Sequence, residues 1–426
     1  MNHIRLTLRG TSAEPRLAAA CRLVLVLLVS CLAMVSCREE SSESSATSSP
    51  SDIDPQIVAQ LRTLGYVSFT PVVREDAGRS GVTLHHSQLS YAGYNLYNTR
   101  TSNLAVLMDM RGRIVHEWSA PELEEAWHHV EMMTNGDLLV LVKGGYLARL
   151  AWDSHLLWKT CMNAHHDVAA AGDGSIYVLD REFIQVPAGD TRLPIVDDSI
   201  HLLSPSGEII RKTSLYPFLG DRLSDKTFEE ITQWLDVGVV DRIIEHCDVF
   251  HNNTVELVHD DLGGLPTKGG FLICARELDL VAIIDLDAQR VVWSWGPGEL
   301  DRPHQPSVTQ SGTILIFDNG MRRGYSRVLE VDPAGGEILW AYEGHPPESF
   351  YSRGRGGAQE LPNGNILITE SDRGRAFEVT RDREVVWEFH NPELAEDEDG
   401  NLERGVIYRM TRIEPCVVEA LLAGPG

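Results

Sequence analysis

The stretch GTILIFDNGMRRGYSRVLEVDPAGGEILWAY, residues 312–342, holds three short apolar runs separated by turns rich in Asp, Gly and Asn. Segments such as GTILIF and RVLEVD have the alternating pattern of half-buried antiparallel strands. The last run ends in Trp340. This stretch therefore predicts a small antiparallel sheet.

The same unit recurs along the chain from about residue 70. Trp293, Trp340 and Trp387 end three successive copies and stand 47 residues apart each time. Several short strands repeated at this period are typical of a β-propeller, in which neighbouring blades cover the faces that a single sheet cannot bury. Six units are recognisable, at residues 103–118, 136–158, 174–213, 269–295, 312–342 and 364–389. We therefore predict an all-β fold, a six-bladed β-propeller; a β-sandwich is the alternative, although a sandwich needs no repeat.

Two segments interrupt the repeat with helical spacing. IDPQIVAQLRTLG, residues 53–65, predicts a short N-terminal helix outside the ring. In the interval between the third and fourth units the apolar residues predict a helical insertion: Phe228, Ile231, Leu235, Val239 and Ile243. The expected division is a signal segment 1–37, a tether and short helix 38–69, a propeller 70–415 and a C-terminal tail 416–426.

The N-terminus reads as a targeting segment. Arg16 and Arg22 flank the start of LVLVLLVSCLAMVSC, which is too short to span a bilayer comfortably and ends in small residues before a cysteine. This resembles a bacterial lipoprotein signal, with Cys37 as the lipidated residue and Cys31 as the alternative. An ordinary secretory signal or anchor would imply export as well. We expect a periplasmic or cell-envelope protein, held to a membrane by its lipid anchor alone.

Composition excludes some partners. The formal net charge of −25 argues against nucleic acid, because phosphate contacts need clustered Lys and Arg. The Ser-rich run 38–52 cannot bury a core and acts as a tether. Cys161, Cys247, Cys274 and Cys416 show no CxxC spacing, so a zinc site is not indicated, while one disulfide is possible.

Four histidine-bearing stretches stand just before predicted strands: AWHHVEMMTNGDLLVL, NAHHDVAAAGDGSIYVLD, DVFHNNTVELV and RPHQPSVTQSGTILIFDNG. Equivalent positions of propeller blades point at one central channel, so His166, His251 and His304 are expected to share a polar site. Arg276 in LICARELD is expected on the innermost strand of its blade, where it needs an anionic partner such as a sulfate, phosphate or carboxylate.

Other readings of these residues compete. Three imidazoles could hold zinc or copper, but the neighbouring Arg276 would oppose a dication. A lone histidine near a strand end is more often a hydrogen-bonded turn residue, and four are interpreted in that way: His116, His201, His345 and His390. The pair His128 and His129 receives no role.

The ordered phrases HHDV, FHNNTVEL, LICARELDLVAIIDLDAQRVVWSWG, HQPSVTQSGTILIFDNG, GGAQELPNGNILI and YRMTRI resemble the bacterial arylsulfotransferases that work without 3′-phosphoadenylyl sulfate (PAPS). The likeness covers roughly residues 80 to 412. It implies a six-bladed propeller that moves a sulfuryl group from one phenol to another through a sulfohistidine, with no cofactor. Pro303-His304-Gln305 departs from the family's usual Gln-His. Where the best-known members carry an additional N-terminal β domain, we expect only a tether and a short segment before the propeller.

The resemblance also assigns residues. His304 matches the nucleophile, while His251, Asn253 and Arg276 match the groups around the sulfuryl oxygens. His166, or its neighbour His165, matches the remaining histidine. Arg322 and Arg323 are interpreted from the sequence as rim residues that attract an anionic donor, or else as part of a solvated turn.

The chemistry suits this set. Sulfuryl transfer resembles phosphoryl transfer, so positioning and electrostatics should dominate. A neutral imidazole is an adequate nucleophile near pH 7, and His251 or His166 could pass a proton to the leaving phenol. No phosphate-binding G-x-x-x-x-G-K-[ST] loop is present for a nucleotide donor. The alternatives are a non-catalytic ligand-binding propeller and a quinone-dependent dehydrogenase; oligomeric state is left open.

Overall fold

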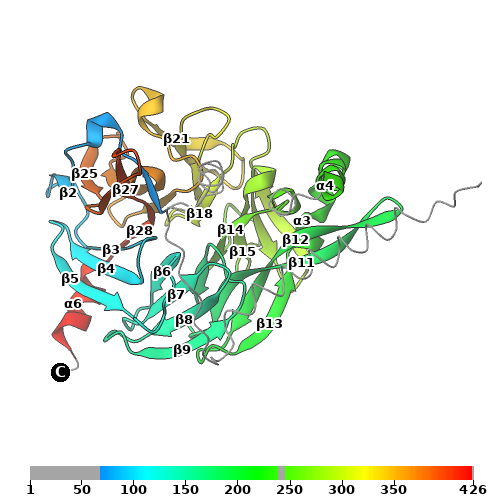
Figure 1. Cartoon of the computed structure of the whole chain (residues 1–426), viewed down its shortest axis with the longest axis horizontal. Coiled ribbons are helices and arrows are strands. Elements are labelled where there is room, and N and C mark those ends of the chain that lie inside the picture. Colours follow the sequence, from blue (N-terminus) through cyan, green and yellow to red (C-terminus); the bar gives the residue numbers. More distant parts are fainter. Residues whose placement is uncertain (1–67, 238–244, 425–426) are drawn as a thin grey trace, which may run out of the picture.

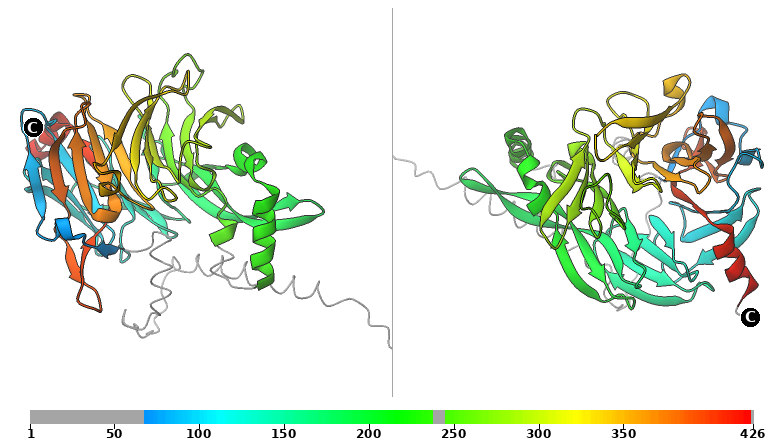
Figure 2. Two further views of the ribbon diagram at one scale, coloured as in Figure 1. Left: turned by 90° about the horizontal axis from the view of Figure 1, so that it is seen from above. Right: turned by 180° about the vertical axis from the view of Figure 1, so that it is seen from behind.

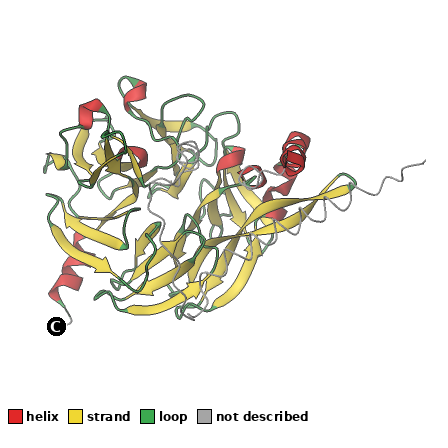
Figure 3. Ribbon diagram, viewed as in Figure 1, coloured by secondary structure: helices red, strands yellow, loops and turns green. Residues whose placement is uncertain are grey.

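The computed structural model describes residues 68–237 and 245–424. The signal segment with Cys31 and Cys37, and the helix expected at 53–65, lie outside these residues. Within them the fold is all-β and propeller-like, with five antiparallel sheets of four strands, one of five and one of three. The two longest helices, α4 (Asp225–Val237) and α6 (Pro415–Ala423), lie at the periphery (Figure 3).

The first three large sheets come from the N-terminal half, apart from one strand. The first is β28 (Ile407–Ile413), β3 (Tyr94–Thr99), β4 (Leu104–Asp109) and β5 (Ile114–Ser119). The second is β6 (His129–Met132), β7 (Leu138–Val142), β8 (Tyr146–Leu150) and β9 (Leu156–Cys161). The third is β10 (Val168–Ala170), β11 (Ile176–Ala188), β12 (Thr191–Leu203) and β13 (Ile209–Ser214).

The remaining sheets follow in chain order. The fourth is β14 (Asn252–Leu257), β15 (Phe271–Ala275), β16 (Leu280–Asp285) and β17 (Arg290–Trp295). The fifth is β18 (His304–Val308), β19 (Ile314–Asp318), β20 (Arg327–Val331) and β21 (Ile338–Glu343). The sixth is β22 (Gly357–Glu360), β23 (Ile366–Glu370), β24 (Arg375–Val379), β25 (Val385–His390) and β2 (Gly81–His85). The small sheet joins β1 (Phe69–Pro71), β27 (Leu402–Gly405) and β26 (Leu394–Glu396).

Each large sheet begins with a short inner strand: β6, β10, β14, β18, β22 or β28. β14 contacts β10 and β18, β22 contacts β18 and β28, and β6 contacts β3, the partner of β28. Successive sheets therefore follow one another around the molecule, as Figure 1 shows. The C-terminal strand β28 completes the N-terminal sheet, so the two ends of the repeat meet.

The repeated tryptophans join neighbouring sheets. Trp158, Trp340 and Trp387 lie on the outer strands of their sheets, and each indole N–H donates to a backbone carbonyl in a turn of the next sheet. In the fourth sheet the corresponding bond comes from Trp295, whose Nε1 donates to Gly336 O at 3.1 Å, and not from Trp293. Trp340 Nε1 donates to Arg381 O at 2.8 Å, and Trp387 Nε1 donates to Met110 O at 2.9 Å, which ties the sixth sheet to the first. Trp158 Nε1 does the same to Pro205 O at 3.0 Å. A hydrogen bond from an outer-strand indole to the next sheet therefore recurs around the molecule, although its register differs in the fourth sheet.

The helical insertion is present in part as α3 (Tyr216–Leu219) and α4 (Asp225–Val237), while Val239 and Ile243 of the predicted helix lie outside the described residues. Residues 176–203 form a long hairpin, β11–β12, and Figure 2 shows this hairpin and α4 projecting from one side of the sheets. The expected C-terminal tail is a helix, α6 (Pro415–Ala423), whose Val418 is buried with Leu96 and Trp118. The 3-10 turns are η3 (Arg74–Asp76), η4 (Gly220–Arg222), η5 (Arg276–Leu278), η6 (Pro347–Ser349) and η7 (Ser371–Arg373).

Two further findings bear on the sequence predictions. Cys247, Cys274 and Cys416 are free thiols, so no disulfide joins any two of these three. Among the described residues, no helix is both long and apolar enough to cross a bilayer.

Candidate functional site

The histidines predicted to converge stand at the heads of the inner strands. His166 precedes β10, His251 precedes β14, and His304 is the first residue of β18. The ring centroids of His166 and His251 are 4.7 Å apart, and those of His128 and His166 are 5.4 Å apart. All four side chains are buried. Four successive sheets thus direct one imidazole each toward one end of the sheet assembly.

The backbone that presents these imidazoles is unusual. His166, His251, Arg302 and Gln305 have positive φ angles of 58°, 49°, 60° and 39°, although none is glycine. Such left-handed conformations cost of order 1 kcal/mol or more each, and they persist where surrounding structure enforces them. At β14 and β18 the register with the next strand also shifts within the first residues. The backbone at the start of these strands is therefore held in unfavourable conformations, which fix where the neighbouring side chains lie.

His304 is fixed in one tautomer by its hydrogen bonds. Its Nδ1 lies 2.7 Å from Asn319 Oδ1 and 3.2 Å from Arg302 O. The orientation of the Asn319 amide is itself determined, because Nδ2 donates to two carbonyls, Ser352 O and Arg355 O, both at 2.7 Å. Both neighbours of Nδ1 are acceptors, so Nδ1 carries the proton and Nε2 carries the lone pair. No described residue makes a hydrogen bond to Nε2.

The surroundings of His304 also keep its imidazole neutral. Burial, reinforced by the positive charge of Arg276, lowers its pKa to about 3, against the opposing effect of the bond to Asn319. At neutral pH the side chain is therefore an uncharged base with a free Nε2. That combination of tautomer and charge suits a nucleophile.

Asn253 positions His304 from the neighbouring inner strand. Its Nδ2 donates to Pro303 O at 2.9 Å, and its Oδ1 accepts from Gln305 N at 3.3 Å. The thiol of Cys274 donates to the same Pro303 carbonyl at 3.2 Å. The side-chain amide of Asn253 therefore contacts the backbone on both sides of His304. Only the second N–H of its Nδ2 is left to make the predicted contact with a sulfuryl oxygen.

His251, His166 and His165 form a chain of imidazoles between two carboxylates. His251 Nδ1 lies 2.6 Å from Asp248 Oδ2, and His251 Nε2 lies 3.2 Å from His166 Nε2. His166 Nδ1 lies 2.7 Å from His165 Nδ1, and His165 Nε2 lies 3.2 Å from Asp198 Oδ1 without good alignment. His166 rather than His165 faces His251, which resolves the pair that the sequence left open. Both ring nitrogens of His166 and of His251 are engaged within this chain.

Arg276 lies beside the cluster, but one sequence expectation about it was wrong. It does not belong to the innermost strand; it follows the second strand, β15, and begins η5. Successive side chains of a strand point to opposite faces of the sheet, whereas a residue in the turn after the strand can lie at the end of the sheet. The turn therefore allows the Arg276 guanidinium to lie at the end of the sheets. Nε and Nη2 donate to Glu277 Oε1 at 3.0 and 2.6 Å, and Arg302 pairs with the same carboxylate. Arg276 Nη1 makes no hydrogen bond to a described residue.

A model of the arylsulfotransferase family (ASST) matches residues 129–392, more than half of the chain. The chain belongs to the arylsulfotransferase family. Its matched region contains every predicted catalytic residue: His166, His251, Arg276 and His304.

Comparison with solved structures adds distant likenesses. A protein of unknown function from Bacteroides caccae is 14% identical, over 75% of this chain and 98% of that one, with a TM-score of 0.46. A streptogramin B lyase is 13% identical, over 81% and 97%, with a TM-score of 0.46. A virginiamycin B lyase from Staphylococcus aureus, with quinupristin, is 10% identical, over 81% and 98%, with a TM-score of 0.43. No curated protein matches significantly.

Three further cations, Arg100, Lys143 and Arg181, were not singled out from the sequence. Arg100, Lys143 and Arg276 each follow the second strand of their sheet, and Arg181 lies within the long second strand of the third sheet, β11. Burial first, and then the positive charges of Arg181, Arg100 and Arg276, lower the pKa of Lys143 well below its ordinary value. The pKa values of His166 and His251 are lowered well below the ordinary value, by burial first and by Lys143 among their charged neighbours. A locally positive potential therefore surrounds the histidines in a strongly acidic protein.

Two predicted rim residues are engaged elsewhere. Arg323 Nη2 donates to Asp318 Oδ2 at 2.9 Å, and its guanidinium lies 4.8 Å from the Tyr325 ring. Arg322 pairs with Asp279 at 2.5 Å and is 62% exposed at its side chain. Both guanidinium groups stabilise the turn after β19. This favours the interpretation of the segment as a turn between strands over a role in attracting an anionic donor.

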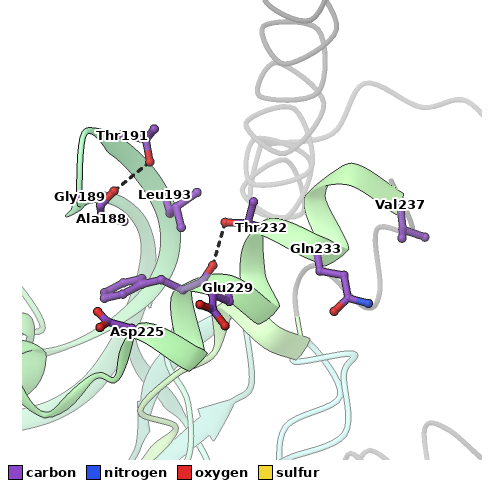
Figure 4. A pocket seen from close by; sticks show the side chains of 10 residues that line it. Ala188, Gly189, Thr191, Leu193, Asp225, Glu229, Thr232, Gln233 and Val237 are labelled. Atoms are coloured by element: carbon purple, nitrogen blue, oxygen red, sulfur yellow. Dashed lines mark hydrogen bonds between the residues drawn. The ribbon is translucent and has the colours of Figure 1, made fainter.

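Two other features of the described residues bear on function. Within residues 68–237 and 245–424, no three His, Cys, Asp or Glu side chains have a metal-binding arrangement. An open groove of about 620 Å³ lies between the hairpin tip and α4, where Leu193 and Phe228 contribute apolar surface (Figure 4). None of the predicted site residues lines this groove.

Proposed function

We propose that this protein is an aryl-sulfate sulfotransferase that moves a sulfuryl group from a phenolic sulfate ester to a phenolic acceptor through a sulfohistidine on His304, without PAPS. In the first half-reaction the lone pair of His304 Nε2 attacks sulfur. The N–S bond forms, the S–O bond to the aryl group breaks, and its electron pair leaves with the phenolate. In the second half-reaction an acceptor phenol takes the sulfuryl group, and the N–S electron pair returns to Nε2.

The observation that carries this proposal is the locked, neutral state of His304. A nucleophilic imidazole must offer a lone pair, and the amide of Asn319 fixes the proton on the other nitrogen. Arg276 supports the proposal, because its unengaged Nη1 can hold a sulfuryl oxygen as charge develops. Glu277 takes the opposite edge of the guanidinium and fixes its plane.

We also propose that the sheets form a six-bladed propeller. The six large sheets correspond to the six sequence units, and the pairing of β28 with β3 joins the last sheet to the first. The site would then occupy one mouth of the central channel, where all inner strands begin.

The test is intact-protein mass after incubation with p-nitrophenyl sulfate in the absence of an acceptor. The expected result is one added sulfuryl group with one equivalent of nitrophenol released, both abolished by His304→Ala. His116→Ala is the matched control, since His116 lies on the outer strand β5, where its ring stacks on that of Trp152. A folded wild-type protein that gains no mass from several donors would leave a ligand-binding propeller as the better reading.

The proposed location is the periplasm or cell envelope, with Cys37 lipidated. Labelling of the expressed protein with a fatty-acid analogue should be lost in Cys37→Ser and kept in Cys31→Ser. The reverse result would move the anchor to Cys31, and labelling of neither form would argue for an ordinary secretory signal.

A further inference from the structure

The proposed reaction needs a base that the residues discussed so far do not supply. An acceptor phenol has a pKa near ~10, as tyrosine does, so it must lose its proton while it attacks sulfur. His251 and His166 are close, but each already uses both ring nitrogens: His251 with Asp248 and His166, and His166 with His251 and His165. A proton acceptor with an uncommitted nitrogen has to come from elsewhere in the site.

The geometry of the transfer indicates where that nitrogen should lie. In an in-line displacement the attacking and leaving atoms lie on opposite sides of sulfur. The phenolic oxygen therefore faces away from His304, across the site. Counting sheets in either direction from the one that begins with β18, the third is the one that begins with β6. The residue immediately before β6 is His128.

His128 has the properties of a waiting base. It is 4% exposed, and neither ring nitrogen has a hydrogen-bond partner. Leaving a buried polar group unpaired costs about 1–3 kcal/mol, and such a group calls for a functional explanation. Its ring lies 4.3 Å from the Tyr408 ring and 5.4 Å from the His166 ring, measured between centroids. Its backbone is fixed, because its N–H donates to Leu141 O at 2.8 Å.

The charge state of His128 agrees with this geometry. Burial, followed by the nearby cations Arg100, Lys143 and Arg355, lowers its pKa well below the ordinary value. The resting side chain is therefore neutral and can accept a proton. The same cations would help to hold the acceptor as it becomes a phenolate.

We propose that His128 is the general base for the acceptor phenol, an inference that rests on the proposed function. The phenol O–H bond breaks and its proton goes to an unpartnered ring nitrogen of His128. The freed electron pair forms the new S–O bond, and the N–S bond breaks back onto His304 Nε2. By microscopic reversibility, the protonated His128 would return a proton to a basic leaving phenolate when the reaction runs backward.

The experiment separates the two half-reactions in His128→Gln. The first is the burst of nitrophenol from p-nitrophenyl sulfate, whose leaving group is acidic and needs no proton. The second is the loss of sulfuryl mass from preformed sulfo-enzyme after a phenol is added. We expect a preserved burst and a second step slowed by about 10²–10⁴ with phenol itself, the usual contribution of a general base. The slowing should shrink for acidic nitrophenols, which are largely ionised already.

His129→Gln is the matched control. His129 is equally buried and unpartnered, and its Nε2 lies 3.6 Å from Asp167 Oδ1. A merely structural effect of replacing His128 would slow all acceptors alike, whatever their acidity, and would overturn the proposal. Wild-type speed with phenol in His128→Gln would overturn it as well. If His128→Gln fails to fold, His128→Ala with added imidazole replaces it, and restoration of the phenol step is the expected result. A wild-type protein that never forms sulfo-enzyme refutes the proposed function itself.

Discussion

Replacing Asn319 with leucine tests whether the tautomer of His304 matters. The change keeps the approximate size of a fully buried side chain but removes the acceptor at 2.7 Å from His304 Nδ1. Without that acceptor the proton can move to Nε2, and a protonated Nε2 cannot attack sulfur. Arg302 O remains at 3.2 Å and still favours the productive tautomer.

The size of the effect can be bounded. A neutral hydrogen bond contributes about 0.5–1.5 kcal/mol net, which corresponds to roughly 2- to 13-fold. A histidine fixed in the wrong tautomer costs about 10⁴ in a serine protease. Because Asn319→Leu loosens the tautomer and does not fix the wrong one, we expect the burst from p-nitrophenyl sulfate to slow by about 10- to 100-fold.

Stability must be followed alongside the rate. The leucine leaves Ser352 O and Arg355 O without this donor, at about 1–3 kcal/mol for each carbonyl that finds no other. Ser326→Ala is the control, since Ser326 Oγ donates to Asn319 O at 2.8 Å and does not contact His304. Ser326→Ala should lower the free energy of unfolding by about 1 kcal/mol and leave the burst rate unchanged.

Nitrogen NMR of the wild-type imidazole gives the direct test. The expected spectrum has a protonated Nδ1 and an unprotonated Nε2 for His304 at neutral pH. A predominantly Nε2-protonated ring, or a leucine variant with an unchanged burst, would refute the reasoning.

Three further outcomes are expected. The burst rate should vary less than about twofold between pH 5 and 8, because the pKa of His304 is lowered to about 3 and its base form persists; an inflection near 6.5 would contradict this. Burial raises the pKa of Asp197 to about 7, so above pH 3.8 the native state binds more protons than the unfolded state, and stability falls as pH rises. Asp197→Asn should therefore raise the free energy of unfolding, measured in urea, by up to about 4 kcal/mol at pH 8 and by little at pH 4. Trp387→Phe should lower the free energy of unfolding by about 1–3 kcal/mol, because it leaves the Met110 carbonyl without its donor. Trp158→Phe should lower it by less, because Trp158 is only half-buried; equal losses in the two variants would contradict the role of the buried indole bond in joining sheets.

The repeat in the sequence predicted much of the fold, for identifiable reasons. Trp293, Trp340 and Trp387 occupy matching registers, each opposite the strand position just before a bulge, so their spacing directly reports the sheet period. The helix at α4 followed from apolar spacing alone. The pairing of β28 with β3 did not follow, because it joins residues some 300 positions apart and depends on the whole assembly.

The site was predicted in position more than in detail. Histidines before strands indicated convergence, since strand heads of successive sheets meet. Their hydrogen bonds could not be predicted, because the left-handed backbone at His166 and His251, and the register shift just after His251, decide which ring faces which. Lys143 did carry a signal: it occupies the place after the second strand that Arg276 occupies two sheets later, and aligning the units would have revealed it.

The late position of β28 in the chain has a consequence for how activity is acquired. This strand supplies Tyr408 beside His128, and Arg409, whose Nη1 bonds Asp167 Oδ1 at 2.9 Å next to His166. Every other inner strand is synthesised before it. Until the last few dozen residues emerge and dock, the first sheet has an open edge and the histidine cluster lacks one of its walls. A chain truncated before β28 would therefore lack the proposed sulfuryl-transfer site, so the proposed activity depends on a strand that is synthesised after all the other inner strands.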